Sequence, residues 1–138
     1  MPSVLFVCLG NICRSPAAEA VLRELAPDWV TDSCGTAGYH VGEPPYGPMQ
    51  QAARGRGIEM SDLRARQFSR ADFDHFDLIC CMDDENLANV ERLRPAGNTT
   101  PVRLFADGPV PDPYYTRDFD GCLDIVQTAA QALVTRGT

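Results

Sequence analysis

Short apolar runs recur along the chain, separated by longer segments whose composition favours helices. Each run is bounded by polar or turn-forming residues, which is typical of a buried strand. The last segment, residues 118–135, places its apolar side chains on one face at helical spacing. The pattern predicts strands at 3–7, 29–34, 78–82 and 102–105, and helices at 17–25, 47–55, 85–93 and 118–135.

Strands that alternate with helices indicate a parallel sheet covered on both faces. The predicted fold class is therefore α/β: a three-layer αβα arrangement with a four-stranded parallel sheet in the order 2-1-3-4, doubly wound and flavodoxin-like. In such sheets ligands bind beyond the carboxyl ends of the strands, at the switch point between the first and third strands. The loop that leaves the first predicted strand, which begins at Cys8, is placed there.

Composition and charge narrow the class of protein. The 138 residues, 44% of them hydrophobic, are enough for one core, so residues 1–138 are predicted to form a single domain. Neither a secretion signal nor an apolar run of membrane-spanning length is visible, and we expect a soluble cytoplasmic protein with no membrane partner. The formal charge of −7 argues against nucleic acid as a partner, because such binding needs a basic surface.

The six cysteines are irregularly spaced, which favours free thiols over a disulfide scaffold. Cys80 and Cys81 are adjacent, and His40 and His75 lie in unrelated contexts, so we predict no metal site and no cofactor. Cys122 lies on the apolar face of the last helix and is predicted to be core. For Cys34, Cys80 and Cys81, burial is favoured over a redox role.

The stretch VLFVCLGNICRSPAAEA, residues 4–20, carries the most specific chemistry. If Val7 ends a strand and Ser15-Pro16 opens a helix, with Ser15 as the cap residue, the loop between them can turn its backbone N–H groups toward one point. Gly10 and Asn11 tolerate the left-handed conformations that such a loop needs. Converging amides at a helix N-terminus predict a binding site for a tetrahedral anion.

The same features act on the thiol of Cys8. The helix N-terminus, the inward amides, the Ser15 hydroxyl and the Arg14 charge all favour the thiolate over the thiol, so Cys8 is predicted to be a nucleophile at neutral pH. Arg14 can hold two oxygens of a phosphoryl group and stabilise the charge that spreads over them during transfer.

Displacing an alcohol or phenol from phosphorus also needs a general acid that later serves as a base. Asp112, in PVPDPYY (109–115), is the candidate. It precedes a proline, which steers it toward extended geometry, and its segment follows the fourth predicted strand. Tyr114 and Tyr115 come next and offer an aromatic wall for a flat substrate, although Tyr115 is equally compatible with packing under the loop.

Together the stretches VLFVCLGNICRSPAAEA, DSCGTAGY, ARQF, DFDHFDLICCMDDENL and DPYY resemble a low-molecular-weight protein tyrosine phosphatase, over essentially the whole chain. The resemblance implies a metal-independent reaction on phosphotyrosine-containing proteins. In this reaction Cys8 forms a phosphocysteine, Arg14 clamps the phosphate and Asp112 serves as general acid and then base. It also implies inorganic phosphate as product and inhibitor, and a monomer or weak dimer.

The resemblance further assigns supporting roles, each carried over by position. The amides of the loop through Arg14 would bind phosphate, and Tyr39 would join the aromatic wall. Cys13 would be the redox partner of Cys8, forming a reversible disulfide under peroxide. The remaining assignments are phosphate binding by Leu9, Gly10, Asn11, Ile12 and Cys13, loop support by Ser15, Glu19, Asp32 and Ser33, and substrate walls at Tyr39, Tyr114 and Tyr115.

One position departs from the resemblance. Many relatives have a histidine before ARQ that supports the loop serine, whereas this chain has Leu63 at about that place. Asp62 or solvent is left to support Ser15 instead.

Three other functions compete with the phosphatase. A thiol-dependent arsenate reductase uses a similar anion loop, but it relays oxidation through two further spaced cysteines, and the adjacent pair Cys80-Cys81 lacks that spacing. A phosphocysteine carrier must avoid hydrolysis, so an acid such as Asp112 would work against it. A silent phosphotyrosine-binding module would usually have lost Cys8 or Asp112, and both are present.

Overall fold

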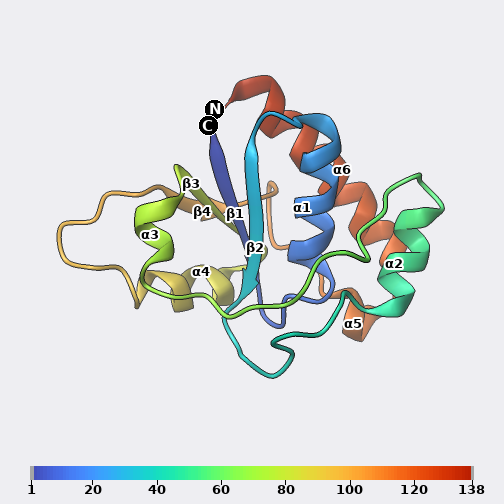
Figure 1. The fold of residues 1–138 in the computed structure, drawn as a ribbon, viewed down its shortest axis with the longest axis horizontal. Helices are drawn as coiled ribbons and strands as arrows, with labels where there is room; N and C mark the ends of the chain where they lie inside the picture. The colour runs from blue at the N-terminus through green and yellow to red at the C-terminus, as the bar shows by residue number, and fades with distance from the viewer. Residues whose placement is uncertain (1, 138) are drawn as a thin grey trace.

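The structure, a computed structural model, describes residues 2–137 and contains one four-stranded sheet (Figure 1). All strand pairs are parallel and the order is β2-β1-β3-β4, which confirms the predicted fold class. Each strand boundary lies within one residue of the prediction. The strands are β1 (Ser3–Cys8), β2 (Val30–Gly35), β3 (Leu78–Cys81) and β4 (Val102–Leu104).

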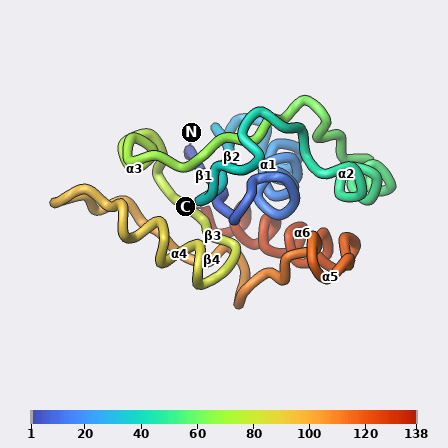
Figure 2. Tube along the Cα trace, turned by 90° about the horizontal axis from the view of Figure 1, so that it is seen from below, coloured from blue at the N-terminus to red at the C-terminus, as the bar shows by residue number. Residues whose placement is uncertain are grey.

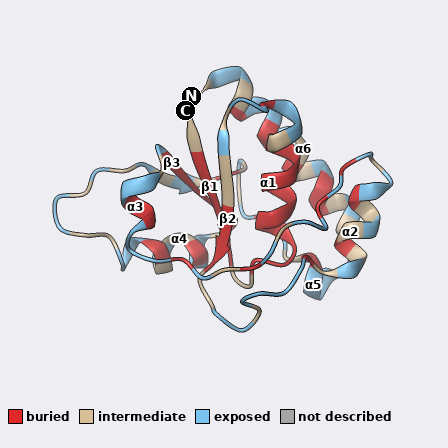
Figure 3. Cartoon of the chain, in the orientation of Figure 1, coloured by how far each residue is buried: buried red, intermediate tan, exposed pale blue. Residues whose placement is uncertain are grey.

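Side chains of the central strand alternate between two buried layers, as expected for a sheet covered on both faces. Val4 and Phe6 belong to the larger core with α1 (Arg14–Leu25), α2 (Gly47–Arg54) and α6 (Phe119–Arg136). Leu5 and Val7 belong to the smaller core with α3 (Asp72–His75) and α4 (Asp84–Glu91). Figure 3 shows β1 and much of α1 as buried, so the strand that leads to Cys8 has a rigid base.

Two short helices escaped the sequence analysis: α3 and α5 (Pro113–Thr116). Each has four residues, too few for a helical period to show in the pattern. His75 ends α3 and is exposed. Among the helices of residues 2–137, none is sufficiently long and apolar to span a bilayer.

The carboxyl ends of β1 and β2 meet at the lower edge of the sheet in Figure 1, where Cys8 pairs with Gly35. Figure 2 views the molecule from below and shows the loop after β1, in blue, between α4 on one side and α5 on the other. Segments from distant parts of the sequence therefore surround the loop that begins at Cys8.

Candidate active site

Hydrogen bonds from neighbouring segments hold the backbone of the Cys8–Cys13 loop at its carbonyl groups. Those of Cys8, Leu9 and Ile12 accept hydrogen bonds from the amides of Thr36, Ala37 and Tyr46, at 2.8–3.0 Å. Across a trans peptide the carbonyl and the following N–H point in opposite directions. The amides of the residues that follow these carbonyls therefore point away from the outer partners, toward the inside of the loop, where an anion would need them.

Two residues allow the loop to close tightly. Asn11 has a φ of 58°, in the left-handed region that asparagine tolerates better than most residues. Gly35 lies against the loop backbone, and a Cβ added there would meet the Leu9 carbonyl oxygen at 2.7 Å. A side chain at position 35 would push the loop away from the sheet.

The Cys8 sulfur lies at the floor of the loop and is almost fully buried. It is 2.9 Å from the Ser15 hydroxyl, and the Asn11 amide donates to it at 3.2 Å. The helix begins at Arg14, with Cys13 at the cap position and no side-chain cap, so the prediction that Ser15 caps the helix was wrong. Because Ser15 is inside the first turn, its hydroxyl faces Cys8 instead of the free amides of the helix end.

Arg14 is fixed by three oxygens although its side chain is almost fully buried. One terminal nitrogen donates to Asp83 at 2.7 Å and to the Val110 carbonyl at 3.0 Å, and the other lies 3.4 Å from Asp112. Burial opposes the charge, but Cys8, Asp83 and Asp112 outweigh it and hold the pKa of Arg14 above its usual range. Arg14 is therefore a permanent cation beside the thiol, which suits an anion clamp.

Asp112 reaches the site in the geometry expected of a residue before proline. Its φ and ψ of −79° and 110° are extended, and one carboxylate oxygen accepts from the Tyr114 amide as the cap of α5. The other oxygen is the one near Arg14. Asp112 and Arg14 are 98 residues apart in the chain, so the structure brings together what the sequence analysis could only assign separately.

A cleft of about 280 Å³ opens above Cys8, and the predicted wall residues and all predicted phosphate-binding residues except the buried Asn11 line it. Tyr39, Tyr114 and Tyr115 line it, and all three rings are exposed, which places Tyr115 on the wall and not beneath the loop. His40 also lines the cleft and pairs with Glu43 at 3.0 Å. His40 had no predicted role, because nothing in its local sequence pattern links it to Cys8.

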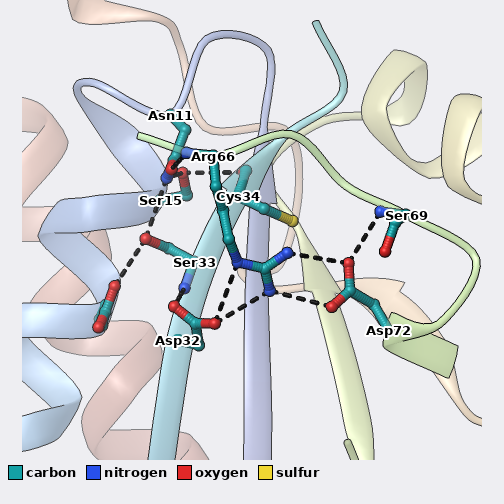
Figure 4. Close-up of polar contacts among 9 residues, drawn as sticks. Asn11, Ser15, Asp32, Ser33, Cys34, Arg66, Ser69 and Asp72 are labelled. Atoms are coloured by element: carbon teal, nitrogen blue, oxygen red, sulfur yellow. Dashed lines mark hydrogen bonds and ion pairs between the residues drawn. The ribbon is translucent and has the colours of Figure 1, made fainter. Parts of the chain in front are cut away.

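Beneath the loop, Asn11 joins two buried hydroxyl groups (Figure 4). Its amide nitrogen donates to Ser15 at 2.8 Å and to Ser33 at 2.9 Å, and Ser33 in turn donates to Glu19 at 2.7 Å. Burial raises the pKa of Glu19 to about 7, against the opposing effect of the Ser33 hydrogen bond. The residues predicted to support the loop thus form one connected network.

Arg66, from the ARQF stretch, ties this network to two further elements and was not assigned by the sequence analysis. Its backbone N–H donates to the Asn11 side-chain oxygen at 3.0 Å. Its guanidinium group bridges Asp32 on β2, at 2.9 Å, and Asp72 at the start of α3, at 3.0 Å (Figure 4). Asp32, which was predicted to lie beside the loop supports, also accepts from the Ser33 amide at 2.8 Å.

Ser15 is supported by a group other than the Asp62 that was expected to replace the missing histidine. Asp62 pairs with Arg23 at 2.9 Å and makes no contact with Ser15, so it does not replace the histidine. Leu63 packs against the larger core. The Ser15 hydroxyl instead lies 3.3 Å from the Cys34 carbonyl, a backbone acceptor that needs no particular side chain.

All six cysteines are free and buried. Burial raises the pKa of Cys80 and of Cys122 to about 12, and it raises that of Cys34 and of Cys81 as well. These four thiols are thus poor nucleophiles at neutral pH.

Asp83, which binds Arg14, is the other residue of the site that was not predicted from the sequence. Its signal was its position directly after the third predicted strand, at the active edge of the sheet.

Comparisons with known proteins agree with this arrangement. The sequence model described as "Low molecular weight phosphotyrosine protein phosphatase" matches residues 3–136. The low molecular weight protein-tyrosine-phosphatase YfkJ of Bacillus subtilis is 40% identical, covering 97% of this chain and 94% of that protein. The low molecular weight phosphotyrosine protein phosphatase of Homo sapiens is 43% identical, covering 86% and 83%.

Solved structures are similarly close. The crystal structure of YfkJ superimposes with a TM-score of 0.92, covering 99% of this chain and 94% of that one. The structure titled as the drosophila arginine phosphatase DARP has a TM-score of 0.91 at 30% identity, covering 96% of each chain.

Proposed function

Because the chain belongs to the low molecular weight phosphotyrosine protein phosphatase family, we propose that it hydrolyses phosphotyrosine in proteins through a phosphocysteine on Cys8. Membership makes the protein a protein-tyrosine phosphatase, a phosphoric monoester hydrolase. The observation that carries the proposed mechanism is the convergence of Cys8, Arg14 and Asp112 on one cleft.

In the first step the Cys8 thiolate attacks phosphorus, an S–P bond forms and the P–O bond to the phenol breaks. Asp112 gives its proton to the departing phenolate oxygen. Arg14 and the inward amides bind the equatorial oxygens and stabilise the charge that is spread over them during the transfer. The Ser15 hydroxyl, already 2.9 Å from the sulfur, donates to the thiolate while Asn11 donates to Ser15.

In the second step Asp112, now a carboxylate, takes a proton from water as the water oxygen attacks the phosphocysteine. The S–P bond breaks, the thiolate is regenerated and inorganic phosphate leaves. Phosphate occupies the same loop as substrate, so it is expected to inhibit competitively.

The cleft walls favour an aryl ester. Tyr39 and Tyr114 present exposed rings on the cleft, a suitable enclosure for a flat phenyl group. Among the residues that line the cleft, the acidic one is Asp112. The mechanism already uses its carboxyl group, so it is not free to pair with a cationic leaving group such as the guanidinium of arginine. Because the similar DARP structure is titled an arginine phosphatase, phosphoarginine is the alternative substrate that the test must include.

The test measures turnover of p-nitrophenyl phosphate, phosphotyrosine and phosphoarginine with a chelator and a reductant present. We expect the first two to be hydrolysed, Cys8→Ser to lose all activity, and Asp112→Asn to lose at least a hundredfold. Cys122→Ser is the matched control, since it changes another buried thiol outside the loop. Absence of turnover in reduced, folded wild type would overturn the proposal. A preference for phosphoarginine would overturn the choice of phosphotyrosine as substrate.

Arsenate reduction and phosphoryl carriage are less well supported. Cys80 and Cys81 are buried in β3 and do not line the cleft, which is unsuitable for a thiol relay. A carrier would be poorly served by Asp112 beside Arg14, because that carboxylate can activate water. An assay with arsenate and an external thiol tests the reductase. Hydrolysis of the labelled phosphoenzyme by water distinguishes the hydrolase from a carrier.

We also propose that peroxide switches the enzyme off reversibly through Cys13. Peroxide oxidises the Cys8 thiolate to a sulfenic acid and is reduced to hydroxide; the Cys13 thiol then displaces water from it and forms a disulfide. Burial raises the pKa of Cys13, and Cys8 raises it further, so Cys13 is not the first to react. Cys13→Ser should make peroxide inactivation irreversible by dithiothreitol, whereas Cys122→Ser should not.

Six free thiols also support placement of the protein in the reducing cytoplasm.

A further inference from the structure

A second groove, which we call the α4 groove, lies on the other side of Tyr39 from the catalytic cleft. It has a volume of about 440 Å³ and lies between the segment that follows β2 and the helix α4 with its C-terminal extension. It shares Leu9 and Tyr39 with the catalytic cleft, so the two hollows are neighbours on either side of these residues. Two other cavities, beside Phe105 and beside Cys122, share no lining residue with that cleft.

The walls of the α4 groove are largely apolar. They include Ala37, Phe68 and Leu93 in addition to the two shared residues. Leu93 is 38% exposed and Tyr39 is 72% exposed, so apolar surface stays in contact with water. An exposed apolar hollow beside a catalytic cleft is the usual form of a subsite for an apolar group.

The polar groups of the groove suit a polypeptide. Glu85, Asn89 and Arg92 lie on its α4 side, and within residues 2–137 no carboxylate, that of Glu85 included, is close enough to Arg92 to form an ion pair. Arg92 donates to the Asn89 side chain alone among described side chains, so most of its N–H groups stay free for another acceptor. The Thr36 hydroxyl, also on the groove wall, is buried and lacks a hydrogen-bond partner in the described residues.

The part of a substrate that lies nearest to the α4 groove is the sequence next to the phosphotyrosine. Consecutive Cα atoms are about 3.8 Å apart, so the flanking residues stay close to a hollow that shares Leu9 and Tyr39 with the catalytic cleft. We propose that the α4 groove binds an apolar side chain that flanks the phosphotyrosine of a protein substrate. The inference rests on the proposed phosphatase function and names a feature of its substrates.

The experiment compares kcat/KM for p-nitrophenyl phosphate with that for phosphotyrosine peptides carrying leucine or alanine at one flanking position at a time. Wild type is expected to prefer leucine about tenfold at one or more of these positions, because burial of that side chain is favourable. Leu93→Glu should abolish the preference and leave p-nitrophenyl phosphate turnover within twofold. Leu25→Glu is the matched control: Leu25 is 40% exposed at the end of α1 and lines neither hollow.

Equal rates for the leucine and alanine peptides at every position would overturn the inference, as would a Leu93→Glu variant that keeps the preference. If Leu93→Glu altered only the sedimentation of the protein, the groove would be a self-association surface and the substrate role would fall. Failure of the wild type to hydrolyse any of these substrates would overturn the proposed function itself, and the inference with it.

Discussion

At the scale of single residues, Glu19 links the pH to the stability of the fold. Its pKa is about 7 in the folded protein, raised by burial, against 4.5 as its ordinary value. Between these pH values the folded state holds a proton that the unfolded state has lost, so stability falls as the pH rises from about 4.5 through 7. The difference corresponds to about 3 kcal/mol.

Glu19→Gln should remove this dependence, because glutamine accepts the Ser33 hydrogen bond without a charge. Urea unfolding at pH 5 should show similar free energies for wild type and variant, whereas at pH 8 the variant should be more stable by about 3 kcal/mol. Glu24→Gln, an exposed position on the same helix, is the control. Parallel curves for wild type and Glu19→Gln would contradict the assignment.

Asp83 combines two roles that one substitution can separate. One oxygen caps α4 by accepting from the Asn86 amide, and the other binds Arg14 at 2.7 Å. Asn is as good a cap residue as Asp but lacks the charge. Asp83→Asn should therefore lower kcat/KM about tenfold, through a less firmly held Arg14, and change the melting temperature little. Asp84→Asn, one residue away on the exposed side of α4, should leave both unchanged; equal effects of the two substitutions would exclude the positioning role.

At the scale of elements, the segment between α2 and α3 acts as a brace for the catalytic loop. Arg66 holds Asn11 through its backbone and ties the segment to β2 and α3 through its guanidinium group. Without the guanidinium anchor the segment loosens, and the hydrogen bond from its backbone to Asn11, whose φ of 58° is left-handed, is held less firmly. Arg66→Ala should lower kcat at least tenfold, measured well below the melting temperature of the variant.

Arg94→Ala provides the comparison. Arg94 also joins a carboxylate, that of Glu91, to the backbone of a later segment, at the carbonyls of Asn98 and Thr100, but it contacts no residue of the loop. It should lower the melting temperature and keep kcat within twofold. If both arginine variants retain wild-type kcat, Arg66 supports only the fold.

The elements themselves were largely predictable, and their contacts were not. Parallel strands buried on both faces read as continuous apolar runs, and for this reason β1 and β3 stand out in the sequence. Asp112 was found because its proline neighbours restrict it locally. By contrast, Arg66 meets Asn11 across 55 residues and Asp83 meets Arg14 across 69, and no local pattern encodes such pairs. The Ser15 cap was predicted wrongly because Ser-Pro is a good helix start, while the bonds to Cys8 and Asn11 use the hydroxyl elsewhere.

At the scale of the whole molecule, an anion must bind against the net charge. With a formal charge of −7 the protein repels phosphate at long range, so binding depends on the permanent Arg14 cation and the inward amides. A ligand that binds only the folded state stabilises it by about 2.7 kcal/mol at a hundred times its Kd. Inorganic phosphate should therefore raise the melting temperature by about 5–10 °C in a chain of this size.

The shift should vanish in Arg14→Ala and persist in Arg56→Ala, which removes a surface arginine bound to Asp120 and Asp124 on α6. Sodium chloride at equal ionic strength controls for screening, which acts over about 10 Å at 0.1 M salt and is the same for both salts. A phosphate effect that survives Arg14→Ala would mean that the anion binds elsewhere. A shift that depends on Arg14 alone would show that one local site overcomes the charge of the entire protein, because long-range repulsion weakens with distance and salt whereas the contacts of the loop do not.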